Sequence, residues 1–215
     1  MTKSTRTLLL FLGMLVTVSH TVRASDPDLT TDFGISAISA ANFTFTGFRN
    51  LQAGGKGVAT PTFASFQQLP GLTGLGLTAV QFEFGPQSQI SPHTHPRATE
   101  IFYVLSGVID VGFVDTNNDL FETTLQTGDL FVFPKGLLHF QRNNGWSSAS
   151  GFSALSSENP GTLLVSNALF TAGGKGLPDN VLATALGASV QTVDSIKSAL
   201  GGSAPPSSAP SPSGY

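Results

Sequence analysis

The chain has 215 residues, of which 40% are hydrophobic and 11% are charged, so it is long enough for one folded domain and too apolar to be disordered throughout. Its 24 glycines, 17 phenylalanines and 13 prolines favour turn-rich β structure over a helical bundle. The formal charge of −3 offers no basic surface for a nucleic-acid backbone, and the absence of cysteine excludes disulfides, thiolate metal sites and cysteine nucleophiles.

The first 24 residues are predicted to be a secretory signal peptide. Lys3 and Arg6 precede an apolar run over residues 8–18, and Ala24 ends a segment typical of a signal-peptidase site. Because a membrane-spanning helix needs roughly 20 apolar residues, secretion is favoured over a membrane anchor. The mature chain is therefore expected to be extracellular and to begin at Ser25, and the Asn-Phe-Thr sequon at Asn42 is consistent with a glycoprotein.

The body of the chain, residues 25–200, is predicted to be a single all-β domain. Short apolar or alternating runs are separated by turn residues, a pattern typical of a sandwich or barrel. Residues 115–119 form a polar turn that predicts a hairpin. The expected strands cover residues 77–84, 101–105, 108–114, 120–125, 130–133, 151–155 and 162–169.

Two short helices are expected after the barrel, because the apolar spacing becomes helical beyond Gly173 and Gly174. Pro178 suits a first helical turn, and Gly187 separates the two helices. Residues 201–215 are rich in serine and proline and are predicted to be a disordered tail. The apolar helix residues are expected to contact the barrel or a neighbouring subunit: Val181, Leu182, Ala185, Leu186, Val193, Ile196 and Leu200.

Three of the four histidines could meet at one point. His93 and His95 are two residues apart, so both imidazoles leave the same face of an extended strand. Pro96 interrupts that strand and allows Glu100 to turn towards the pair, while a turn before His139 can bring it alongside. Three imidazoles and a carboxylate suit Mn, Fe, Zn, Cu or Ni. Taken alone, a His-x-His pair is more often polar surface or hydrogen-bonded core.

The spacing of these residues resembles the two motifs of the cupin superfamily, and within it those of the germins, germin-like proteins and their spherulin relatives. The segments around residues 92–100 and 112–117 and at the mature start are also similar to germins. The first motif is matched by His93, His95, Glu100 and Gly107. The second is matched by Gly128, Pro134, Gly136, His139 and Asn143.

This resemblance implies a cupin double-stranded β-helix, or jelly-roll barrel, with short C-terminal helices. It also implies that His93, His95, Glu100 and His139 bind one metal ion, usually manganese. Germins are typically hexamers, trimers of dimers in which the C-terminal helices clasp neighbouring subunits. A homo-oligomer of that kind is therefore expected here.

Four positions depart from the germin pattern. Gly34 stands where germins have the first of two cysteines, so the amino-terminal arm must be held without a disulfide. Gln87 replaces the first glycine of the first motif, which predicts a reshaped entry to that strand. Val80 and Ile90 stand where oxalate-oxidising germins have two asparagines, and apolar side chains there leave the oxygens of a small dianion unpaired.

Two functions remain open from the sequence. The first is superoxide dismutation by bound manganese, an activity that the resemblance to germin-like proteins implies, with hydrogen peroxide as product. The second is a non-catalytic extracellular metal-binding protein with a structural, storage or receptor-like role. A dioxygenase or isomerase that uses iron is a third class, and oxalate oxidation is disfavoured. Arg97 is expected to be a channel residue or, in preference, a member of a surface ion pair.

Overall fold

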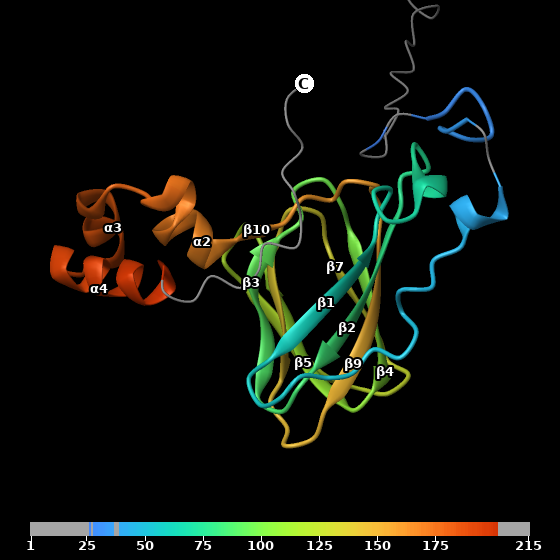
Figure 1. Cartoon of the computed structure of the whole chain (residues 1–215). Helices are drawn as coiled ribbons and strands as arrows, with labels where there is room; N and C mark the ends of the chain where they lie inside the picture. The colour runs from blue at the N-terminus through green and yellow to red at the C-terminus, as the bar shows by residue number, and fades with distance from the viewer. Residues whose placement is uncertain (1–25, 27, 37–38, 202–215) are drawn as a thin grey trace, which may run out of the picture.

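The computed structural model describes residues 26, 28–36 and 39–201, and it shows a β-barrel with a helical arm on one side (Figure 1). The predicted signal peptide lies outside these residues, as does the predicted tail apart from Gly201. Within the described part of the chain, no helix is long and apolar enough to cross a membrane.

The barrel consists of two five-stranded sheets in which every paired strand is antiparallel. The first sheet has, in spatial order, β1 (Ala59–Ala64), β2 (Thr78–Phe84), β9 (Ala149–Leu155), β4 (Glu100–Ser106) and β7 (Leu130–Phe133). The second has β10 (Leu163–Leu164), β3 (Ser88–Thr94), β8 (Leu138–Asn143), β5 (Val108–Val114) and β6 (Leu120–Gln126). The predicted jelly-roll barrel is confirmed.

The core lies between the sheets because alternate residues of each strand point inward. Burial in β2 and β9 alternates residue by residue along their whole lengths. Phe82 of β2 and Phe102 of β4 meet edge-on with ring centroids 5.9 Å apart. A Cβ added to Gly151 of β9 would lie 2.3 Å from the Phe102 ring, so only glycine leaves room for that ring. The middle of the barrel is therefore a packed aromatic core.

Sequence periodicity missed part of the barrel. The expected strand over residues 162–169 is wrong: only Leu163 and Leu164 pair with β3, and the chain then forms α2 (Val165–Phe170). Val165, Ala168 and Leu169 are spaced as a helix requires, which explains the change. The strands predicted from apolar runs did not include β1, β3 and β8. The reason is that β1 is mostly half-buried, while β3 and β8 turn polar side chains inward.

The helical arm contains α2, η3 (Ala172–Gly174), α3 (Asp179–Leu186) and α4 (Val190–Gly201). Pro178 is the residue before α3, and Gly187 ends that helix in the left-handed conformation at φ 60°. Leu182 and Val193 were expected to contact the barrel or a neighbouring subunit; both are buried within the chain itself, which leaves them no exposed surface for a neighbour. Val181 and Leu186 remain exposed.

The amino-terminal segment, which includes η1 (Ala40–Phe43), is held to the barrel without a disulfide, and η2 (Pro70–Leu72) lies in the connection between β1 and β2. The Asp26 carboxylate accepts hydrogen bonds from the Ser157 hydroxyl at 3.0 Å and from the Glu158 backbone N–H at 2.7 Å. Gln87, which replaces a motif glycine, keeps a left-handed backbone at φ 55°. Its side-chain amide donates to the carbonyls of Asn144 and Gly145, which offsets part of that strain.

Candidate metal centre

The four predicted ligands lie in, or directly after, three strands that belong to both sheets. His93 lies in β3, and His95 follows directly after that strand ends at Thr94. The turn that begins at Pro96 carries the chain across to the other sheet, where Glu100 is the first residue of β4. His139 lies in β8 opposite His93. The chain therefore changes direction at Pro96, as the sequence suggested, and it passes there from one sheet to the other.

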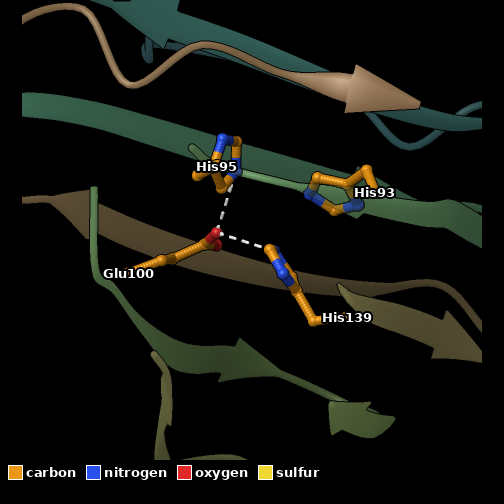
Figure 2. A group of neighbouring side chains, drawn as sticks. All are labelled: His93, His95, Glu100 and His139. Carbon is orange, nitrogen blue, oxygen red and sulfur yellow. Dashed lines mark ion pairs between the residues drawn. The ribbon is translucent and has the colours of Figure 1, made fainter. Parts of the chain in front are cut away.

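The four side chains converge inside the barrel (Figure 2). One ligand atom from each lies within 4.8 Å of all the others. The Oε2 atom of Glu100 is 3.1 Å from Nε2 of His95 and 3.4 Å from Nε2 of His139. All four residues are buried, with between 1% and 5% of their surface exposed. The expected meeting of three imidazoles and one carboxylate is present.

The backbone fixes which nitrogen of each ring faces the centre. The Nδ1 atoms of His93, His95 and His139 lie 2.8, 2.5 and 2.8 Å from the carbonyl oxygens of Ser91, Gly161 and Leu137. A carbonyl oxygen only accepts hydrogen bonds, so each Nδ1 carries a proton and donates it. In a neutral ring the Nε2 lone pair is then left for the centre, as in a metal-ligating histidine.

The Glu100 carboxylate is oriented by two buried neighbours. Its Oε1 atom accepts hydrogen bonds from the Ser153 hydroxyl at 2.6 Å and from the Gln141 amide at 3.3 Å. Burial alone would raise the pKa of Glu100, but its contacts with the rings of His139 and His95 outweigh burial and hold that pKa below its usual range. Glu100 is therefore an anion whose second oxygen, Oε2, faces the histidines.

The electrostatics of this cluster suit a bound cation. Burial lowers the pKa of His93 to about 3, helped by the neighbouring His139 and His95, so that ring is neutral. The Glu100 Oε2 and His139 Nε2 atoms are buried and have no hydrogen-bond partner. Convergent acceptors with no donor between them are costly in a protein interior unless a cation lies among them. The cluster could thus hold a metal ion.

Two residues that orient Glu100 were missed from the sequence. Gln141 lies two residues after His139, so strand alternation could have placed its side chain inside the barrel. Nothing in the sequence marked Ser153. Val80 pairs with Ser153 and Ile90 pairs with Gln141 in the strand register, so both apolar residues lie beside the Glu100 partners.

Comparisons with known proteins agree with this geometry. The cupin family model matches residues 54–194. The chain is 40% identical to germin-like protein 5-1 of Oryza sativa subsp. japonica, over 89% of this chain and 92% of that protein. It is also 40% identical to the rhicadhesin receptor of Pisum sativum, over 77% and 78% of the two chains.

Solved structures agree as well. An oxalate oxidase structure superposes with a TM-score of 0.74 at 30% identity, covering 83% of this chain and all of that one. Sequence, fold and buried cluster therefore point to one family. The chain belongs to the cupins and, among them, to the germin-like proteins.

Proposed function

We propose that His93, His95, Glu100 and His139 bind one manganese ion and that the loaded protein removes superoxide. The observation that carries the proposal is the convergence of one ligand atom from each of the four residues in a buried centre, where the Glu100 Oε2 and His139 Nε2 atoms have no hydrogen-bond partner. Nitrogen and carboxylate ligands without a thiolate suit manganese, iron and other divalent transition metals. The resemblance to germins favours manganese among these.

The protein's own residues prepare the centre before any ion binds. Three backbone carbonyls hold the histidine rings with Nε2 inward, and Ser153 and Gln141 hold Glu100 with Oε2 inward. Such outer contacts fix ligand direction and tune the bound metal. When bound, manganese supplies one-electron redox chemistry, by which two superoxide ions and two protons become dioxygen and hydrogen peroxide.

The residues around the centre support a small substrate over a dicarboxylate. Val80 is 1% exposed in the core, and Ile90 packs against the same core. Neither offers a hydrogen-bond donor, so the oxygens of oxalate would lose water without a replacement there, at about 1–3 kcal/mol for each unpaired group. Oxalate oxidation is therefore disfavoured, although solved relatives of this chain are oxalate oxidases.

Manganese counting and a superoxide assay test the proposal together. We expect about one manganese per purified wild-type chain and superoxide removal above the rate of the same amount of free manganese. Glu100→Gln and His139→Ala should lose both, while Glu122→Gln, a matched change at an exposed position on β6, should keep both. Iron in place of manganese in the isolated protein would instead indicate a dioxygenase or isomerase.

A non-catalytic role is the second candidate. A chain fully loaded with manganese that removes no superoxide would contradict the catalytic proposal and favour an extracellular structural, storage or receptor-like protein. The similarity to the rhicadhesin receptor supports that alternative, because that protein is named for a receptor function. Secretion itself is part of both proposals, and it rests on the predicted signal peptide at residues 1–24.

We also propose that the chain forms a homo-oligomer, with a hexamer as the expected state. The outer face of β4 and β7 supports self-association, because Ile101 pairs with Val132 and Tyr103 with Leu130, and all four side chains are at least 40% exposed. An apolar face of this kind is typical of an interface. Light scattering should give a mass several times the 22.3 kDa of the full chain.

A further inference from the structure

The three histidine rings of the centre are fixed in two different ways. His93 and His139 each donate from Nδ1 to the carbonyl two residues earlier in the chain, so the local strand is sufficient to orient them. His95 donates instead to the carbonyl of Gly161, which lies 66 residues away in the loop between β9 and β10. The direction of the His95 ring therefore depends on where that loop lies.

Arg97 contacts every residue of the 159–161 loop. Its backbone N–H donates to the Pro160 carbonyl at 3.1 Å. Its guanidinium donates from Nε to the Asn159 carbonyl at 2.5 Å and from Nη2 to the Asn159 side-chain oxygen at 2.8 Å. A Cβ added to Gly161 would lie 2.9 Å from Nη2 of Arg97, so the guanidinium packs directly against the Gly161 backbone.

We propose that Arg97 is a positioning residue for the metal centre: it holds the loop at residues 159–161 so that the Gly161 carbonyl fixes the ring of His95. The inference rests on the proposed function, because it requires His95 to be a ligand. Arginine suits the task, since its planar fork makes two directed, charge-assisted hydrogen bonds at once. This role differs from the channel residue and the surface ion pair that the sequence suggested.

The Gly161 backbone shows why the loop needs such a clamp. Gly161 has φ +67°, a left-handed conformation that L side chains rarely adopt, and its carbonyl direction follows from that conformation. With the Arg97 guanidinium on one side and the His95 ring bonded to the carbonyl, this peptide is held from two directions. Removing the guanidinium leaves the loop free to rotate the carbonyl away from His95.

Manganese binding to the purified full chain tests the role of Arg97. The protein is stripped with a chelator and titrated with Mn(II), and the paramagnetic resonance signal of free Mn(II) gives the dissociation constant. We expect Arg97→Gln to weaken binding by about 10-fold or more, as loss of an outer contact typically does. The zero-field splitting of the bound ion should also change, because the His95 ring turns.

Matched variants separate positioning from general destabilisation. Arg49→Gln removes another exposed arginine, outside this network, and should leave both readouts unchanged. Arg97→Lys keeps the positive charge but lacks the planar guanidinium, so its affinity for manganese should lie between those of the wild type and Arg97→Gln. If Arg97→Gln does not fold, Asn159→Leu removes the acceptor of the Nη2 hydrogen bond alone, and it should weaken binding a few-fold.

The outcomes distinguish this inference from the proposed function. If the folded Arg97 variants bind manganese with wild-type affinity and wild-type zero-field splitting, the inference is overturned, even where their melting temperatures fall. If the Arg97 variants do not fold, the same result in Asn159→Leu overturns it. In both cases the proposed function still stands. A wild-type chain that binds no manganese would overturn the proposed function and this inference with it. Weakened binding in the Arg97 variants beside an unchanged Arg49→Gln would support the positioning role.

Discussion

The barrel and the helical arm bury their apolar side chains to very different extents. The barrel encloses a cluster of twelve buried hydrophobic residues between its two sheets. By contrast, α3 and α4 each bury one residue, Leu182 and Val193, and leave others such as Val181 and Leu186 about half exposed. Figure 1 shows the arm standing to one side of the barrel. The difference indicates that most apolar burial within this chain lies in the barrel, while the arm leaves apolar side chains on its surface.

The largest expected effect comes from the barrel core. Phe102 is fully buried and contacts Phe82, Phe84 and Phe133. Phe102→Ala leaves a cavity beside Gly151, which cannot fill it, and should lower the free energy of unfolding by about 3–5 kcal/mol. Urea unfolding of the metal-free protein measures the change. A loss below about 1 kcal/mol would contradict the idea that the barrel carries the stability.

Acid should destabilise the barrel through the candidate metal centre. The pKa of His93 is about 3 in the folded chain against an ordinary 6.5, so the unfolded chain binds more protons at pH values between the two. Stability is then fully present above about pH 6.5 and falls as the pH drops, by up to about 1.4 kcal/mol per pH unit. The lowered pKa of Glu100 acts in the same direction, below the ordinary pKa of a carboxyl.

Unfolding of the metal-free protein between pH 6 and pH 4.5 measures this slope. In His93→Gln the glutamine takes up no proton. The change in the free energy of unfolding with pH should therefore be smaller than in the wild type, by up to about 1.4 kcal/mol per pH unit, the contribution of one proton. Equal slopes in the two proteins would show that His93 is not held neutral by burial.

Substitutions at exposed apolar residues of the arm are expected to have the smallest effect on the barrel and its manganese content. Lysine at both Val181 and Leu186 should leave manganese content unchanged, because neither residue contacts the centre, while light scattering should show smaller assemblies. Thr184→Lys places the same charge at an exposed polar position of α3 and should have little effect on mass. An unchanged mass in the double variant would show that these apolar residues are not an interface.

The sequence predicted the barrel and its four convergent side chains because these depend on local patterns. Alternating apolar residues identified strands such as β2, and the spacing of His93, His95, Glu100 and His139 matched two short motifs. What remained hidden depends on contacts between distant segments. The bond from His95 to Gly161 joins residues whose meeting no local pattern encodes. The same holds for β10, which is defined by its pairing with β3 rather than by its own apolar run.

The Asp26 contacts have a practical consequence for making the protein. The amino-terminal segment is attached by a carboxylate that bonds Ser157 and the Glu158 backbone, in a chain that contains no cysteine. No oxidant or disulfide isomerase is therefore required for folding, and thiol reductants have no covalent bond to break. The mature chain should reach its native state in a reducing bacterial cytosol, provided that no glycan is needed there. High salt, which weakens charge-assisted contacts at the surface, should loosen this attachment where dithiothreitol does not.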